Sequence, residues 1–523
     1  MPNVEKDPLF ILIKTLTKSE KRNFKLFVRR TNSKEEAKFI QLFDALDTME
    51  SLDDKVLFKK VPKIKRAQLS NMKAHLYKQI LIALRLNHNQ HNVDIQLSES
   101  LDFAKVLYNK GLYKQSLKLL NKTKVLAMNS KHNTIVLQIL EFEKLIESQY
   151  ITRSIHGRAD ELVNQSLTYL ETIKTTNLLS NLALQLYGLY LKMGYVRNES
   201  DYKKMKTFMK ENLPQVKEDE LSFFERLYLY QSHVWYNYII QDFIMCYRYA
   251  QKWVDLFKNN PDMIEQRPSL YLKGLHNLLA ALFNLGHYPK FVDVFNELEQ
   301  VNQLDNVRLN RNIEVLLFLY VSTNRINKHF LEGSFSDGLE FVPQLEKGLK
   351  EYYNYLDPHR VLIFYYKIAS LYFGSGDNLK AIEYLEKVIK YKDVSLREDI
   401  HCFARILNLI AHYEAGLDNA LEYQVKSVYH FLGKMNDLHK VQIEIFKFLK
   451  KLNRITVNDL KQEFKALRDR LKVCREDVYE SRPFLYLDII SWLESKINNI
   501  TVQEVIRENF EQAGKTKTFQ LKE

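Results

Sequence analysis

The sequence predicts an all-α protein, and two features of its composition carry that prediction. Only 14 glycines and 10 prolines occur among 523 residues, less than half of what average usage would give. Leu, Lys, Glu, Ile and Asn fill the long stretches between these breakers, and hydrophobic residues make up 46% of the chain. Helices can therefore run without interruption and still bury apolar faces. A chain of this length forms several domains or a repeat array.

The positive charge of the chain is concentrated at its N-terminal end. The formal net charge is +13. Residues 1–90 contain 19 Lys and Arg against 10 Asp and Glu, whereas the other 433 residues contain 58 against 54. This asymmetry favours an anionic partner for the N-terminal end and says little about the rest of the chain.

Cysteine usage and hydropathy indicate a reduced, soluble protein. Cys246, Cys402 and Cys474 lie far apart and form no CxxC pair, so neither a disulfide framework nor a cysteine zinc site is expected. No run reaches the roughly 18 apolar residues of a membrane span, and the first residues lack a secretory cleavage site. We expect a cytoplasmic protein with no membrane partner.

A basic helical domain is predicted over residues 1–92, ending at the polar stretch NHNQHN. Four helices are expected in it, at 17–30, about 34–50, about 53–60 and about 67–86. Thr17 and Glu20 have the spacing of a capping box at the start of the first helix. Pro62 separates the last two helices, because proline interrupts a helix interior.

The first of these helices carries a stripe of cations. In LTKSEKRNFKLFVRR, residues 16–30, the 100° step per residue gathers five of them on one face, beside an apolar face. This stripe consists of Lys18, Lys21, Arg22, Lys25 and Arg29. A second basic cluster, KKVPKIKR, precedes the fourth helix and contains Lys59, Lys60, Lys63, Lys65 and Arg66. Such residues contact phosphates at helix N-termini; a solvated helix face is the commoner outcome, and the sequence favours it.

Helical hairpins are expected to repeat over residues 93–438. In YYKIASLYFGSGDNLKAIEYLEKVIKY, residues 365–391, an apolar helix, a Gly-Asp turn and a second apolar helix follow one another. FAKVLYNKGLYKQSLKLLNKTKVL, residues 103–126, has the same plan, with Gly111 in the turn and Ser116 as a small residue after it. The spacing of these and similar turns averages about 44 residues. The further turns are expected near Gly157, Gly194, Asp242, Gly286, Gly333 and Gly416.

The hairpin at 365–391 resembles the tetratricopeptide repeat. The residues that match the family's pattern are Tyr365, Ile368, Ala369, Tyr372, Gly376, Asp377 and Ala381. Leu385, Val388 and Asp393 depart from it. The spacing also exceeds the roughly 34 residues of this family and lies in the HEAT and armadillo range of roughly 40–47. The resemblance implies an α-solenoid of tetratricopeptide-like hairpins, and a HEAT-like stack is the alternative.

Stacking would give the hairpins a shared groove. Each hairpin buries its apolar face only against its neighbours, so the array becomes a superhelix with a concave side. Helices over residues 439–512 are expected to cap the array, with capping signals at Thr456 and Thr501. Residues 513–523 are expected to form a flexible tail. The Tyr and Phe residues have the spacing of core positions, so the sequence assigns none of them to the groove.

Local signatures of enzymes are absent from the sequence. It contains no GxxxxGK[ST], GxGxxG, HExxH or GxSxG motif, and GSGD at 374–377 is read as a repeat turn. His88, His91 and Asp94 have a spacing that could hold a divalent ion, but a polar linker explains them better. We therefore predict no catalytic residue, no metal site and no cofactor.

The resemblance implies a non-enzymatic scaffold or adaptor that binds a peptide or protein partner in the superhelix groove. The alternative is a nucleic-acid-binding regulator, in which the basic head contacts phosphates and the superhelix senses a partner. An enzyme without a local motif is a third, less favoured hypothesis. The sequence does not predict the oligomeric state.

Overall fold

Every regular element that the structure describes is a helix, which confirms the all-α prediction for those residues. The computed structural model describes residues 7–30, 36–62, 64–88, 92–149, 157–303, 310–391, 398–417, 421–434, 440–451, 455, 457–477, 479–485 and 488–516. They form two compact units, residues 1–171 and 172–523. Within the described ranges, no helix has both the length and the apolar character needed to cross a membrane.

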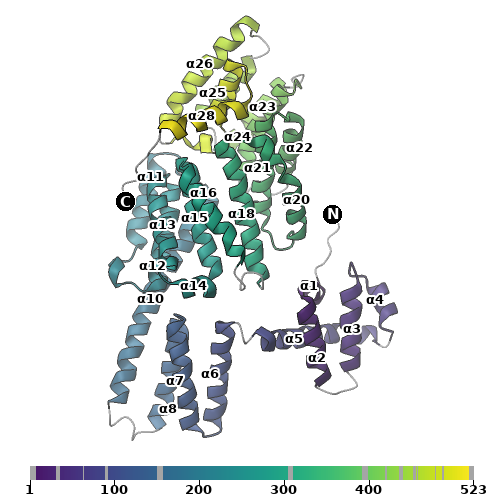
Figure 1. Cartoon of the computed structure of the whole chain (residues 1–523), viewed down its shortest axis with the longest axis vertical. Coiled ribbons are helices and arrows are strands. Elements are labelled where there is room, and N and C mark those ends of the chain that lie inside the picture. Colours follow the sequence, from purple (N-terminus) through teal and green to yellow (C-terminus); the bar gives the residue numbers. More distant parts are fainter. Residues whose placement is uncertain are drawn as a thin grey trace. The chain divides into compact units, whose positions relative to one another are not determined.

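Five helices surround the first core of the first unit (Figure 1). They are α1 (Pro8–Thr15), α2 (Lys18–Arg30), α3 (Glu36–Thr48), α4 (Asp54–Lys60) and α5 (Arg66–His88). The sequence predicted α2 to α5 with ends within two residues, but it missed α1. A signal for α1 was present, because Pro8 starts the helix and the Asp7 carboxylate accepts a hydrogen bond from the Phe10 backbone N–H.

A second, separate core in the first unit lies among α6 (Val93–Asn109), α7 (Tyr113–Asn129), α8 (Asn133–Gln149) and the start of α10 (Arg158–Met193). The α6–α7 turn contains Gly111 with φ +75°. After it, the buried Ser116 hydroxyl donates to the Ala104 carbonyl at 2.8 Å. In the α7–α8 turn the left-handed residue is Lys131, with φ +58°. Glycine positions therefore do not predict this turn. The predicted boundary at residue 92 lies between these two cores.

One long helix departs from the hairpin pattern. α10 runs without interruption for 36 residues, and the two glycines predicted to mark turns, Gly157 and Gly194, stand just outside its two ends. The interval between them therefore contains a single helix and no turn. The division between the two compact units falls inside this helix.

The second unit continues from the end of α10 through a series of helices in which neighbours in sequence pack together, such as α12 on α13, α15 on α16 and α21 on α22. α15, α18 and α21 also contact one another in that order. The elements are α11 (Glu199–Asn212), η1 (Glu218–Glu220), α12 (Phe223–Ile239), α13 (Phe243–Lys258), α14 (Pro261–Gln266), α15 (Pro268–Leu285), α16 (Tyr288–Gln300), η2 (Val301–Gln303), α18 (Arg311–Glu332), α19 (Phe335–Leu339), α20 (Val342–Glu351), α21 (Pro358–Ser375), α22 (Asn378–Ile389), α23 (Glu398–Glu414), α24 (Leu421–Lys434), α25 (Lys440–Lys451), α26 (Val457–Glu476), η4 (Arg482–Leu485), α27 (Ile489–Asn498) and α28 (Val502–Thr516).

Left-handed backbone marks the turns of this unit. Gly286, Gly333 and Gly376 end α15, α18 and α21 with φ between +64° and +93°, a conformation that glycine adopts without steric cost. Near the turn predicted at Asp242, the left-handed residue is Gln241, and Asp242 caps α13. Glycine positions therefore located most of the turns, because the preference is local.

The last helix folds back onto the middle of the unit. Thr501 and Glu504 form the predicted capping box, and α28 packs against α18 and α21. A Cβ atom on Gly333 would lie 2.5 Å from the backbone nitrogen of Arg507 in α28, so this contact requires glycine. α28 continues to Thr516, past the predicted start of the tail at residue 513. Thr456 and residues 517–523 lie outside the described residues, and the predicted domain boundaries at 438 and 512 stay predictions.

Candidate functional site

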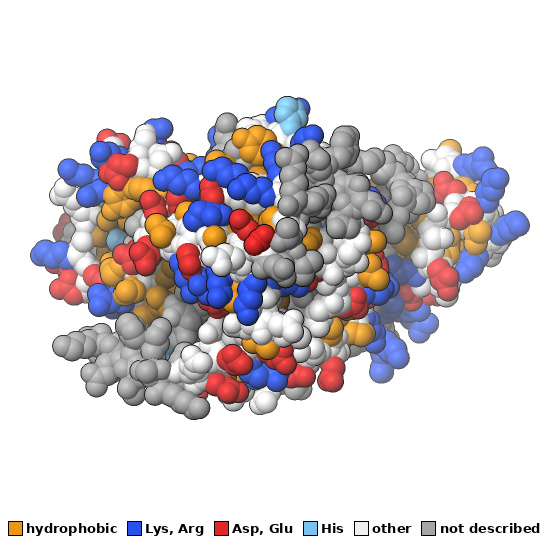
Figure 2. All heavy atoms as spheres, turned by 90° about the horizontal axis from the view of Figure 1, so that it is seen from above, with side chains coloured by type: hydrophobic (Ala, Val, Ile, Leu, Met, Phe, Trp, Pro, Cys, Tyr) orange, Lys and Arg blue, Asp and Glu red, His pale blue; other side chains and the backbone are white. Residues whose placement is uncertain are grey.

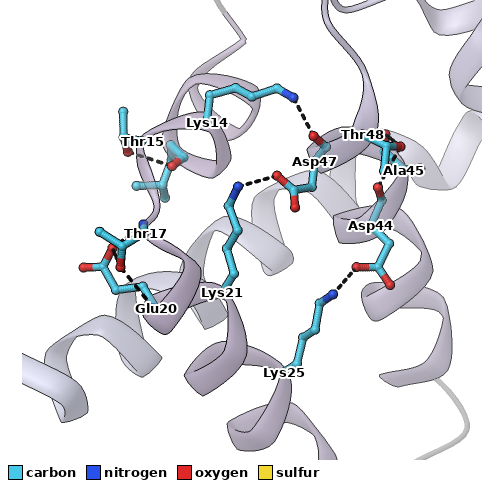
Figure 3. A network of polar contacts seen from close by, with 11 residues as sticks. Lys14, Thr15, Thr17, Glu20, Lys21, Lys25, Asp44, Ala45, Asp47 and Thr48 are labelled. Atoms are coloured by element: carbon cyan, nitrogen blue, oxygen red, sulfur yellow. Dashed lines mark hydrogen bonds and ion pairs between the residues drawn. The ribbon is translucent and has the colours of Figure 1, made fainter.

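The basic stripe lies on α2, as predicted. Phe24 and Val28 of the same helix are buried in the first core, which turns the other side of α2 outward. The Thr17 and Glu20 capping box fixes its start: the Thr17 backbone N–H donates to the Glu20 carboxylate at 2.7 Å (Figure 3). The helix therefore presents the stripe because its apolar positions are used for packing.

Two cations of the stripe are engaged by acidic residues of α3 (Figure 3). Lys21 Nζ lies 2.6 Å from an Asp47 carboxylate oxygen, and Lys25 Nζ lies 2.6 Å from one of Asp44. Lys14 of α1 donates to the Asp47 carbonyl at 2.6 Å. Cations at the C-terminal end of a helix interact favourably with its dipole. These side chains therefore have a structural role in joining α1 and α2 to α3.

The other three cations of the stripe carry no such role. Lys18, Arg22 and Arg29 are exposed, and they form no ion pair with any residue that the structure describes. The stripe is thus divided. Part of it holds the domain together, and part of it is open to a ligand or to solvent.

The second basic cluster is divided in the same way. Lys60 donates to the Thr48 hydroxyl at 2.8 Å, and the Arg66 guanidinium lies 5.4 Å from the centroid of the Phe58 ring. Lys59 and Lys65 are exposed, and no described residue pairs with them. Lys63 lies outside the described residues.

A different set of cations meets inside the second unit, and the sequence did not predict it. Lys273 of α15 and Arg360 and Lys367 of α21 are half-buried; we call these three residues the cation cluster. Arg360 and Lys367 are seven residues apart, which places them on one face of α21. Lys273 Nζ lies 5.8 Å from the ring centroid of Tyr187 in α10, and Lys367 Nζ lies 5.3 Å from that of Phe330.

Hydrogen bonds connect the cluster across α15, α18 and α21. Lys367 Nζ donates to Asn327 Oδ1 at 2.6 Å, and Asn327 Nδ2 lies 3.4 Å from Asn324 Oδ1. Asn324 Nδ2 lies 3.2 Å from His276 Nδ1 and also donates to the Tyr320 carbonyl at 2.8 Å. The His276 ring stacks on Tyr320 with centroids 4.2 Å apart. Because an amide NH₂ only donates, His276 Nδ1 accepts, and the imidazole is neutral in this arrangement.

Burial and mutual repulsion act on the charges of this region. Burial lowers the pKa of Lys367 to about 8, and burial together with the positive charge of Arg360 lowers the pKa of Lys273. Burial, reinforced by Arg360, Lys367 and Lys273, lowers the pKa of His276 to about 3. These shifts share one origin, since low dielectric and neighbouring positive charge both disfavour a further positive charge.

The cation cluster differs from other cations of the second unit in lacking carboxylate partners. Arg311 pairs with Glu314 and Glu351, and Arg325 pairs with Glu299. No described residue forms an ion pair with Lys273, Arg360 or Lys367. Asp357, at the N-terminus of α21, pairs with His359, and the charge of Arg360 also helps to lower the pKa of this carboxyl without forming an ion pair. On the face of the molecule drawn in Figure 2, basic and acidic side chains are intermixed.

The sequence contained a signal for this site. Each cation interrupts an otherwise apolar helix, as in YLKGLHNLL and YYKIASLYF, and Asn324 and Asn327 interrupt α18 in the same manner. Polar residues at core spacing are unusual because burying them is costly. The site remained hidden because residues from three helices, up to 94 positions apart in the sequence, form it only after packing.

The other groups of polar residues give no support for a metal site or a reactive cysteine. Among the described residues, no group of three or more His, Cys, Asp and Glu side chains is arranged to hold a metal ion. Of the three residues with metal-like spacing in the sequence, Asp94 interacts with His132, and His91 lies outside the described residues. Cys246, Cys402 and Cys474 form no disulfide with one another. Burial raises the pKa of the Cys246 and Cys474 thiols, which disfavours the reactive thiolate.

In comparisons with protein-family models, curated proteins and solved structures, nothing matches this chain. No relative therefore assigns a role to the α2 stripe or to the cation cluster. The chemistry of the side chains is the basis for a functional proposal.

Proposed function

We propose that this protein is a non-enzymatic scaffold or adaptor that binds a peptide or protein partner on the face formed by α15, α18 and α21. The observation that carries the proposal is the cation cluster. Lys273, Arg360 and Lys367 all act on His276 from half-buried positions. None of them forms an ion pair with a described carboxylate, and only Asp357 lies within electrostatic reach of Arg360. Holding like charges together in this way costs stability, which a purely structural role would not require.

The arrangement of the helices supports a tetratricopeptide-like superhelix for the second unit. α15 and α21 both end at a left-handed glycine and are followed by a second helix that packs back on them. Ala381, the small residue expected early in the second helix of its hairpin, is fully buried. These features favour tetratricopeptide-like hairpins with a spacing of about 44 residues over a HEAT-like stack. Such an array would present its first helices side by side along the groove.

The outward cations of α2 favour a second candidate function. Lys18, Arg22 and Arg29 are exposed on one helix face without a described partner. In this alternative they would contact the phosphates of a nucleic acid, and the second unit would sense another molecule. Such binding would be strongly salt-dependent, because it releases counterions from the nucleic acid.

An affinity purification from native lysate distinguishes the two functions. The full chain would be compared, with and without nuclease, with a Lys18→Glu, Arg22→Glu, Arg29→Glu variant. Lys21 and Lys25 stay unchanged because they pair with α3. A scaffold retains the same protein partners in both chains and after nuclease treatment. Nucleic acid that co-purifies with the wild type and disappears with the variant would support the regulator instead.

A further inference from the structure

We infer that the cation cluster of Lys273, Arg360 and Lys367 binds the carboxylates of an acidic segment in a partner protein. This inference rests on the proposed scaffold function and names the chemistry of its ligand. The site takes Asp and Glu side chains, or a chain-terminal carboxylate, from an extended peptide.

The donors of the cluster are mostly unused. An ammonium has three N–H donors and a guanidinium has five. Lys367 uses one donor on Asn327, whereas Lys273 and Arg360 donate to no described residue. Carboxylates are suitable acceptors for these groups, since hydrogen bonds between two charged partners are about twice as strong as neutral ones.

The surrounding side chains hold the cations without neutralising them. The rings of Tyr187 and Phe330 lie beside Lys273 and Lys367, and cation–π contacts of this kind orient a charge and leave it positive. Asn327 is itself fixed through Asn324 and His276. The ligand would therefore meet preorganised cations, which lowers the entropy cost of binding.

The spacing of the cations fits an extended peptide. Arg360 and Lys367 are seven residues apart on one helix, so their Cα atoms are separated by roughly 10 Å. A peptide in the polyproline II conformation advances about 9 Å in each three-residue turn, so acidic side chains at positions i and i+3 lie on one face and can address both. A nucleic acid carries a phosphate at every nucleotide and requires a longer basic track, whereas this face offers three cations between neutral and apolar residues.

A titration with a defined acidic peptide tests the inference. A fluorescein-labelled oligoglutamate would be titrated with the full chain while its fluorescence anisotropy is followed. The site variant is Lys273→Gln, Arg360→Gln, Lys367→Gln. The control variant, Lys204→Gln, Lys206→Gln, Lys210→Gln, removes the same charge from exposed positions of α11. A charge-preserving variant, Arg360→Lys with Lys367→Arg, shows whether positive charge alone is sufficient.

We expect wild type and control to bind alike, and each cation removed from the site to weaken binding about tenfold. The charge-preserving variant should retain most of the affinity. Circular dichroism would establish that each variant is folded. If the triple site variant does not fold, the three single variants are compared with the wild type in the binding assay instead.

Three results would overturn the inference: no binding of oligoglutamate by the wild type, equal loss in site and control variants, or tighter binding of an oligonucleotide that is lost in the site variant. The scaffold function is judged separately, from the lysate capture. Partners that persist with the site variant would leave the scaffold standing and remove this site from it.

Discussion

Lys367 and Asn327 are joined by a 2.6 Å hydrogen bond between α21 and α18, and the ammonium makes this bond while burial disfavours its charge. The same lysine lies beside Phe330 and Phe283. A positive charge is therefore retained in surroundings that would suit an apolar side chain.

Replacing Lys367 by Met should stabilise the second unit at neutral pH. The folded-state pKa of Lys367 is about 8, below the ordinary value of about 10.4. Between these pH values the unfolded chain binds a proton that the folded chain does not, so the stability of the wild type rises with pH. The difference between variant and wild type should shrink by up to about 1.4 kcal/mol per pH unit above pH 8. Urea unfolding followed by tryptophan fluorescence measures this difference in the free energy of unfolding. A difference that does not change with pH would contradict the prediction.

Acid sensitivity should depend on His276. Its folded-state pKa is about 3, so only the unfolded chain takes up this proton between about pH 6.5 and 3, and stability falls as the pH falls. Arg360, Lys367 and Lys273 reinforce the effect. In His276→Phe, which keeps a ring against Tyr320, the loss of stability from pH 7 to 4 should be shallower. His233, whose pKa burial lowers to about 4, titrates in both proteins and cancels in the comparison. Parallel pH profiles would argue against a neutral His276.

Gly333→Ala should cost more stability than Gly286→Ala. Both glycines end a helix with nearly the same positive φ, so both variants carry a backbone strain of about 1–2 kcal/mol. Only at Gly333 would the new Cβ meet the α28 backbone, whereas nothing lies within 4 Å at Gly286. Thermal unfolding gives the difference, and limited proteolysis should show α28 released in Gly333→Ala alone. Equal melting temperatures would mean that α28 does not pack on this turn.

The first unit should depend on a buried ion pair. Glu143 is 2% exposed and accepts from Lys124 at 2.6 Å and from Arg158 at 3.3 Å. Glu143→Gln leaves the buried Lys124 without its partner, whereas Arg158 keeps Glu161 at 2.6 Å, so the change should destabilise the unit by about 3–5 kcal/mol. Lys124→Met with Glu143→Leu should recover part of the loss.

The control for this prediction is Glu141→Gln. Glu141 pairs with Lys144 on the exposed side of the same helix, where an ion pair contributes less than about 1 kcal/mol. The tryptophans are residues 235, 253 and 492 in the second unit, so hydrogen exchange of α7 and α8 peptides is the suitable readout. Similar exchange rates in Glu143→Gln and Glu141→Gln would contradict the prediction.

Local rules explain which parts of the fold the sequence predicts. Helix ends in the N-terminal domain follow from Thr17, Pro62 and hydrophobic periodicity, and glycines such as Gly376 mark turns because φ is a property of one residue. The turn at Lys131 was not predicted, because residues other than glycine sometimes adopt the same conformation. The turn predicted near Asp242 is present, with Gln241 in that conformation. Between the turns predicted near Gly157 and Gly194, a hairpin repeat would place two helices, whereas the chain forms the single helix α10.

Local rules predict much less of the candidate sites than of the fold. Charge periodicity located the α2 stripe, yet it did not separate Lys21 and Lys25, which pair with α3, from the outward cations. That distinction depends on Asp44 and Asp47, which belong to another helix. The cation cluster lies on α15 and α21, which both pack on α18, so no local rule brings Lys273 to Arg360.

Site-specific crosslinking shows whether an acidic segment of a partner binds at the cation cluster. Benzoylphenylalanine would replace Tyr187, beside Lys273, and, in a separate chain, Tyr353, which is 63% exposed in the same unit. We predict that light crosslinks position 187 to a peptide rich in Asp and Glu in a partner protein. Excess oligoglutamate should suppress this product, and position 353 should give no such product. Equal crosslinking from both positions, or partners that co-purify without any crosslink at 187, would contradict it.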